Sequence, residues 1–133
     1  MLAWFLIYVS IIATILVIDA IWLGVVAKKF YANQLGSLMR QDIKALPAVA
    51  FYLLFAVGLV ILAVRPADAS TTMGLSALYG ALVGFIAYGT YNMTNYATLN
   101  NWPIKMSCID WPWGTALSAL AAVVGSYVKL TLT

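Results

Sequence analysis

The chain has 133 residues, of which 65% are hydrophobic and 8% are charged, and it contains no His. Soluble domains carry roughly 25% charged residues, so the composition excludes an ordinary soluble domain and indicates an integral membrane protein. A chain of this length can hold four spanning helices of about 20 residues each with short connections, which leaves no room for a second domain.

Composition also limits the chemistry that we expect. Cys108 is the only cysteine, so an internal disulfide is excluded, and without His a zinc or iron site of the usual Cys/His kind is not expected. No cofactor motif and no metal site are evident. The net charge of +3 arises from basic residues scattered at the ends of apolar segments, with no basic run. This distribution indicates membrane topology and not nucleic-acid binding.

Four apolar segments follow one another along the chain. We predict an all-α, multi-pass membrane protein in which four transmembrane helices form an antiparallel bundle. The first segment is too long for a signal peptide and its basic residues follow it instead of preceding it, so we expect it to be retained. The predicted helices span about residues 2–27, 46–64, 72–97 and 106–128.

The connection between the first two predicted helices is longer than a turn. Between Phe30 and Ala45, apolar residues such as Tyr31, Leu35 and Leu38 recur at helical spacing. A short helix lying at the membrane interface would account for this pattern, and a partly ordered loop is the alternative.

Orientation follows from the basic residues of the connections. The segments after the first and third helices carry five Lys or Arg, whereas the opposite side carries two, Arg65 and Lys129. The positive-inside rule therefore predicts a cytoplasmic position for the first set. In a bacterial cytoplasmic (inner) membrane both termini would then be periplasmic.

Two aspartates interrupt the apolar segments. Asp19 lies roughly 12 Å from the inner end of the first helix, and Asp110 roughly 8 Å from the inner end of the fourth, at 1.5 Å per residue. Both acids therefore share one depth near the cytoplasmic side. Because an ionisable group in hydrocarbon is costly, such residues usually face a polar interior or a site.

Other polar and aromatic residues are predicted at the same depth. In the third helix, Asn92 and Asn95 are three residues apart, and Tyr88 and Thr98 lie one turn above and below them. A tryptophan follows each acid by three residues, so that its indole N–H is available as a donor on the face of its own acid. The candidate ligand-binding or polar-site residues are Asp19, Trp22, Tyr88, Asn92, Asn95, Thr98, Asp110 and Trp113.

Small residues indicate where helices meet. Gly80 and Gly84 form a G-x-x-x-G pair, and Gly114 and Ser118 begin a similar stripe on the fourth helix. Packing within the chain is the favoured use of these stripes, and packing against another chain is the alternative.

Three stretches of the sequence resemble a known family. Asp19-Ala20-Ile21-Trp22-Leu23-Gly24, the stretch from Tyr91 to Pro103, and Asp110-Trp111-Pro112-Trp113-Gly114-Thr115 are similar to signature stretches of a bacterial predicted-membrane-protein family, domain-of-unknown-function family 2177. The resemblance covers nearly the whole chain. It implies a four-helix membrane protein with these polar positions grouped, and no accepted activity. In the family the position of Asn92 is often an acid, so this chain has an amide where others have a third carboxyl.

Three classes of function are compatible with these features. The favoured one is binding or moving a small amphipathic molecule, a lipid headgroup or a cation at the intramembrane polar site. An accessory subunit that packs against a membrane-protein partner, or a homo-oligomer, through the Gly and Ser stripes is the first alternative. An enzyme that uses Asp19 or Asp110 as acid or base on a lipid-soluble substrate is the second, although no nucleophile–base pair supports it. A network that only fixes helix packing would also explain the polar residues.

Overall fold

Four helices in the computed structural model are long and apolar enough to cross a membrane, Leu2–Val26, Ala45–Val64, Met73–Thr98 and Ile104–Leu132. The structure describes residues 1–67 and 72–133, and these contain no strand. The prediction of an all-α protein with four spans is confirmed, and the spans imply a lipid bilayer as the surroundings. In chain order the elements are α1 (Leu2–Ile21), η1 (Trp22–Val26), α2 (Lys28–Leu35), η2 (Gly36–Leu38), α3 (Ala45–Leu59), η3 (Val60–Val64), α4 (Thr72–Thr98) and α5 (Ile104–Leu132).

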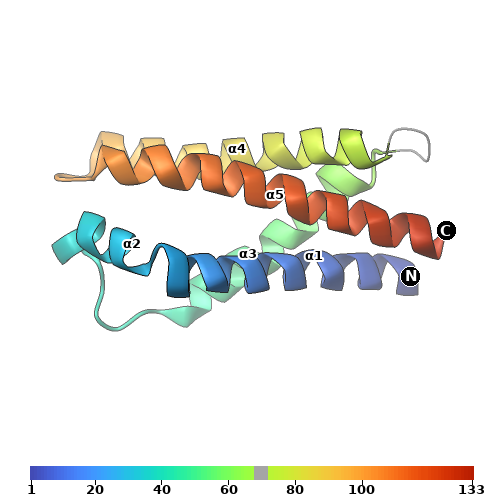
Figure 1. Cartoon of the computed structure of the whole chain (residues 1–133), viewed down its shortest axis with the longest axis horizontal. Coiled ribbons are helices and arrows are strands. Elements are labelled where there is room, and N and C mark those ends of the chain that lie inside the picture. The colour runs from blue at the N-terminus through green and yellow to red at the C-terminus, as the bar shows by residue number, and fades with distance from the viewer. Residues whose placement is uncertain (68–71) are drawn as a thin grey trace.

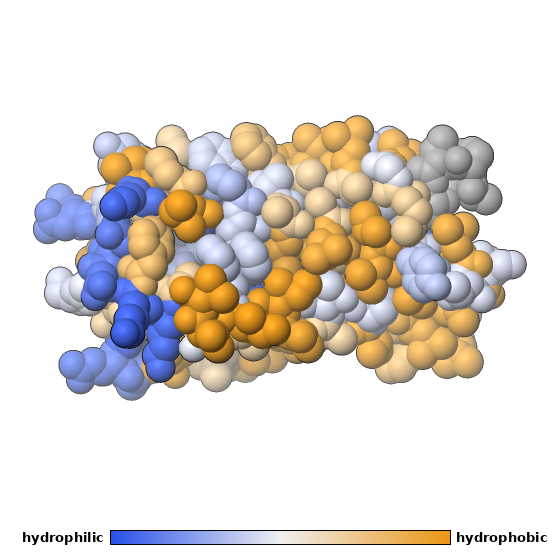
Figure 2. Space-filling model, in the orientation of Figure 1, coloured by the Kyte–Doolittle hydropathy of each residue, from blue (hydrophilic) through white to orange (hydrophobic). Residues whose placement is uncertain are grey.

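The spans run alternately up and down, and the two termini lie at the same end of the bundle (Figure 1). Helix α2 and the connection to α3 lie at the opposite end. Figure 2 shows that the hydrophilic residues gather at this α2 end, while most of the remaining length is covered by apolar side chains. This distribution is the one expected of a bundle whose sides face lipid.

The first connection is helical in its first part. Helix α2 and the 3-10 turn η2 together cover residues 28–38, and an irregular segment leads on to Ala45. The chain passes from α2 into η2 at Gly36, whose φ of 52° suits a residue without Cβ. Of the two alternatives, the short helix is thus found, and it ends where the glycine permits the chain to turn.

Two of the spans end in a π-helical turn. The N–H of Ala27 donates to the carbonyl of Trp22 at 2.7 Å, and the N–H of Arg65 donates to the carbonyl of Val60 at 2.8 Å. Each bond spans five residues instead of four, which widens the helix locally. The first π turn begins only three residues after Asp19, so it changes the direction of Trp22 and the residues that follow it.

The core lies towards the end that carries the termini. Ile7, Ile11 and Ile15 recur every four residues on α1 and are at most 1% exposed. They belong to one buried cluster with residues of α3, η3 and α5, among them Leu59 and Leu117. A single face of α1 thus anchors the first span to the second and the fourth.

Helices α4 and α5 approach each other closely through small residues of the same chain. A Cβ on Gly84 would lie 2.3 Å from Oγ of Ser118 and 2.6 Å from the carbonyl oxygen of Gly114, and one on Gly80 would lie 2.6 Å from Cβ of Ala122. No side chain fits at these positions without displacing the partner helix. The contact is therefore of the close, small-residue kind that stabilises helix pairs in lipid.

Polar groups join the helices at the end of the bundle that carries the termini. The hydroxyl of Ser126 donates to that of Ser76, which joins α5 to α4. The ammonium of Lys129 donates to the carbonyl oxygens of Val64 at 3.1 Å and Ala67 at 2.8 Å. Lys129 thus caps the C-terminal end of the second span, where the last carbonyls have no partner within the helix.

Candidate functional site: an intramembrane cavity between the helices

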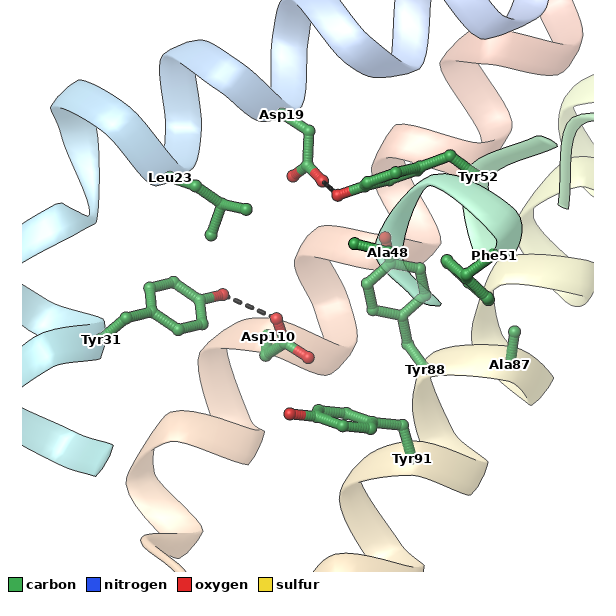
Figure 3. Close-up of a pocket in the computed structure, with 10 residues that line it drawn as sticks. All are labelled: Asp19, Leu23, Tyr31, Ala48, Phe51, Tyr52, Ala87, Tyr88, Tyr91 and Asp110. Atoms are coloured by element: carbon green, nitrogen blue, oxygen red, sulfur yellow. Dashed lines mark hydrogen bonds between the residues drawn. The ribbon is translucent and has the colours of Figure 1, made fainter. Parts of the chain in front are cut away.

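A cavity of about 410 Å³ lies at the depth of the two aspartates, between α1, α2, α3, α4 and α5 (Figure 3). Its wall combines two carboxyl groups and several tyrosines with small and apolar side chains. Each of the five helices supplies at least one lining residue. The lining residues are Asp19, Leu23, Tyr31, Ala48, Phe51, Tyr52, Ala87, Tyr88, Tyr91 and Asp110.

Asp19 projects from the last turn of α1 and is 6% exposed. The hydroxyl of Tyr52 on α3 donates to its Oδ2. The indole N–H of Trp113 on α5 donates to its Oδ1 at 3.2 Å. Both oxygens of this buried carboxyl are therefore held by donors from other helices.

Asp110 lies in α5 and is 8% exposed. The hydroxyl of Tyr31 donates to its Oδ1 at 2.7 Å, and the amide of Asn92 donates to its Oδ2 at 2.8 Å. Burial, followed by the hydrogen bond to Asp110, raises the pKa of Tyr31 well above its usual range. The phenol thus keeps its proton and remains a donor to the carboxyl.

The two tryptophans connect the acids in a crossed arrangement. The rings of Trp22 and Trp113 stack with their centroids 4.1 Å apart and their planes 10° apart. Trp113 donates to Asp19 on the other helix, whereas the N–H of Trp22 donates at 3.2 Å to the hydroxyl of Tyr31, which in turn bonds Asp110. The expectation that each indole serves the acid of its own helix is not what the structure shows, because the stack turns each ring towards the neighbouring helix.

The residues expected on α4 divide into two pairs. Tyr88 lines the cavity, and its ring lies directly against the backbone of Gly114, where a Cβ would be 2.0 Å from Cγ of the tyrosine. Asn92 is fully buried and bonds Asp110. Asn95 and Thr98 do not line the cavity, and the hydroxyl of Thr98, which is exposed, donates to the carbonyl of Thr94 at 2.7 Å.

Three lining tyrosines were not among the residues singled out from the sequence. The sequence marks Tyr31 only as part of the apolar pattern of the first connection and Tyr91 only as the start of the second signature stretch, and no motif contains Tyr52. A signal existed, because a tyrosine inside a span must find a partner for its hydroxyl. Tyr52 meets that need with Asp19.

The charge of the cavity is not balanced by its wall. Its lining includes two acids and no Lys or Arg. Over residues 1–67 and 72–133 the one ion pair joins Arg40 to Asp42 at 3.2 Å, and both of these side chains are largely exposed. In the same part of the chain, Oδ1 of Asn92 is buried without a hydrogen-bond partner. The site therefore offers acceptors, and no protein cation meets them.

Metal binding by the usual ligands has little support in this geometry. Within the described ranges, no group of three or more His, Cys, Asp or Glu side chains could hold a metal ion. Two carboxyl groups that each already accept two hydrogen bonds do not supply the six or more oxygen ligands that calcium or magnesium requires.

A second hollow of about 350 Å³ lies beside the cavity. The two share Asp19, Leu23 and Tyr52 in their walls. The remaining lining of the second hollow comes from α1 and η1, including the small residues Ala20 and Gly24. The hydrogen-bonded pair of Asp19 and Tyr52 thus stands between two spaces.

Residues 4–127 match a protein family described as Predicted membrane protein (DUF2177). The chain belongs to this family. The match covers most of the sequence and confirms the resemblance seen in the three stretches. Among curated proteins and solved structures, none matches the chain. For this DUF2177 protein the cavity therefore has to be interpreted from its own chemistry.

Proposed function

We propose that this DUF2177 protein binds, or moves, a small amphipathic molecule whose polar head occupies the layer of Asp19 and Asp110. The observation that carries the proposal is that the two buried acids, which come from the first and the last span, line one and the same cavity. A volume of about 410 Å³ lies within the range of roughly 300–1,000 Å³ that is typical of small-molecule sites.

The rest of the wall suits the apolar part of such a molecule. Leu23, Ala48, Phe51 and Ala87 line the cavity without polar side-chain atoms. A few convergent polar groups within an apolar wall are characteristic of ligand pockets. A network whose only purpose was helix packing would need no space of this size between its members.

The basic residues indicate which side of the membrane the α2 end of the bundle faces. The α2 end carries five Lys or Arg in its connections, so it is assigned to the cytoplasm of a bacterial inner membrane, with both termini periplasmic. The cavity then opens nearer the cytoplasmic leaflet. A reporter fused to either terminus tests this assignment, because an alkaline phosphatase fusion should be active and a green fluorescent protein fusion dark.

The two alternative functions receive less support from the described contacts. Gly80 and Gly84 are occupied by α5 of the same chain, so these stripes are not free to receive a partner protein. The groups bonded to Asp19 and Asp110 are phenols, an indole and an amide, and none of them is the Ser, Cys or Thr of the usual nucleophile–base pairs.

Native mass spectrometry of the detergent-purified protein tests the proposal. We expect wild type to carry a small molecule that is lost both in Asp19→Asn/Asp110→Asn and in Ala48→Trp, which fills the cavity. Asp42→Asn, which changes an exposed acid, is the matched control and should retain the molecule. An empty protein in all four samples, with or without added membrane extract, would contradict binding at this cavity.

A further inference from the structure

The chemistry of the cavity wall narrows the class of ligand. A buried carboxylate is costly unless it is paired with a positive charge or fully hydrogen-bonded. Each oxygen of Asp19 and Asp110 accepts one hydrogen bond from the protein, which leaves further acceptor capacity on both groups. Because the lining contains no basic side chain, a ligand that enters the space can supply the missing donor and charge.

The aromatic residues favour the same kind of ligand. Figure 3 shows the rings of Tyr31, Tyr88 and Tyr91 placed around Asp110, with Tyr52 at Asp19. The faces of aromatic rings attract cations, and this attraction is strongest where the contact is desolvated. Aromatic rings together with carboxylates form the environment that recognises organic ammonium groups.

The size and lining of the space argue against a bare inorganic ion. A cavity of about 410 Å³ is far larger than one ion, and Leu23, Phe51, Ala48 and Ala87 offer it no oxygen ligands. Calcium and magnesium need six or more oxygens, partly from water, in a compact arrangement. An apolar body attached to the positive head would fill the volume that an ion leaves empty.

We propose that the ligand of this cavity is an organic ammonium ion with an apolar body. Its head lies between Asp19 and Asp110 against the tyrosine rings, and its body lies along Leu23, Phe51 and Ala87. The inference rests on the function proposed above, and it names the chemical class of the molecule bound. Such an ion could be a free amine or the ethanolamine headgroup of a lipid, which share the same chemistry.

A pair of probes of equal shape tests the charge requirement. 4-Phenylbutylamine, which is protonated at pH 7, is compared with its uncharged isostere pentylbenzene, in which a methyl group replaces the ammonium, by equilibrium dialysis against the protein in dodecyl maltoside micelles. We expect the cation to bind at least tenfold more tightly than the isostere, after subtraction of the partition into empty micelles. Equal binding of the two probes would overturn the ammonium inference.

Variants assign the binding to the cavity. Asp19→Asn/Asp110→Asn should lower the affinity for the cation at least tenfold and leave the isostere unchanged, whereas Asp42→Asn should change neither. If the double variant fails to fold, as judged by gel filtration and circular dichroism, Tyr91→Leu serves instead. Tyr91 is half-exposed, and we expect its replacement to weaken the cation threefold to tenfold. Cation binding that survives all of these changes would contradict the proposal.

Lipid competition separates the two sources of the ammonium group. Phosphatidylethanolamine added to the micelles should displace the probe if a lipid headgroup is the natural occupant, and phosphatidylglycerol, which has no amine, should not. Displacement by neither lipid indicates a free amine, and both results support the class. Equal binding of the cation and the isostere that Ala48→Trp abolishes would keep the proposed cavity function while rejecting the ammonium ion. Binding of neither probe to an empty cavity would reject both.

Discussion

The two ends of the bundle are built in different ways. At the end that carries the termini, isoleucines on one face of α1 and the small residues of α4 and α5 bring backbones into close contact. At the α2 end, aromatic and acidic side chains face a cavity, and the helices are joined mainly through hydrogen bonds and stacked rings. The comparison indicates a rigid half that holds the helices together and a polar half that leaves space for a ligand.

The largest effect should follow from a large side chain in the rigid half. Gly84→Leu would force its side chain into Ser118 and the backbone of α5, and overpacking of this kind costs about 3 kcal/mol of unfolding free energy. Unfolding in a mixed-micelle titration with sodium dodecyl sulfate measures this loss. Gly74→Leu is the control on the same helix, because a Cβ at Gly74 meets nothing within 4 Å. Equal losses in the two variants would contradict a close contact between α4 and α5 at Gly84.

In the polar half, the next effect should come from the crossed tryptophans. Trp113→Phe removes the donor to Oδ1 of Asp19 and weakens the stack on Trp22, so we expect a loss of about 2 kcal/mol. The same titration measures it. If the arrangement acts as a unit, Trp22→Phe/Trp113→Phe should lose less than the sum of the single variants. Additive losses would show that the two rings are energetically independent.

A smaller loss of stability should follow from removing the single hydrogen bond between Tyr52 and Asp19. Tyr52→Phe keeps the ring but removes the hydroxyl that donates to Asp19, with an expected loss of about 1 kcal/mol. Tyr96→Phe alters an exposed tyrosine on α4 and should have no measurable effect. Since Tyr52 separates the cavity from the second hollow, the variant should also raise the exchange rate of a bound probe. Unchanged stability and unchanged exchange would argue against a closed Asp19–Tyr52 contact.

The smallest effect is expected at the cap of the second span. Lys129→Met removes the ammonium from the carbonyls of Val64 and Ala67, and interactions at a helix C-terminus contribute about 0.5 kcal/mol. Lys105→Met, at an exposed position, is the matched control. Thermal unfolding in detergent measures this loss. High salt should lower the unfolding temperature of wild type but not that of Lys129→Met, because only wild type has the ammonium that salt can screen.

Much of the fold could be predicted because length and hydropathy define a transmembrane helix. The common depth of Asp19 and Asp110 needed only the rise per residue and the alternation of the spans. What the sequence could not supply is the rotation of each helix about its axis. Nothing in the spacing shows that Trp113 turns towards Asp19, or that a π turn redirects Trp22.

The same limit explains the two residues of α4 that lie outside the cavity. At 100° per residue, Thr98 is rotated by roughly 120° from Asn92, and Asn95 by roughly 60°. The spacing of three residues therefore keeps neighbours together but lets the far end of a series turn away. Tyr52 was missed for a different reason, because it lies in a span without charge, where only its hydroxyl marks it as polar.

Lys129 also has a consequence for the order in which the protein is assembled. The carbonyls of Val64 and Ala67 are made and inserted 65 and 62 residues before the side chain that caps them. During synthesis water must satisfy these groups, so the end of the second span has to stay at the wet surface of the bilayer until the last helix arrives. The last carbonyls at the end of the second span thus gain their hydrogen-bond donor only when the final span has been inserted.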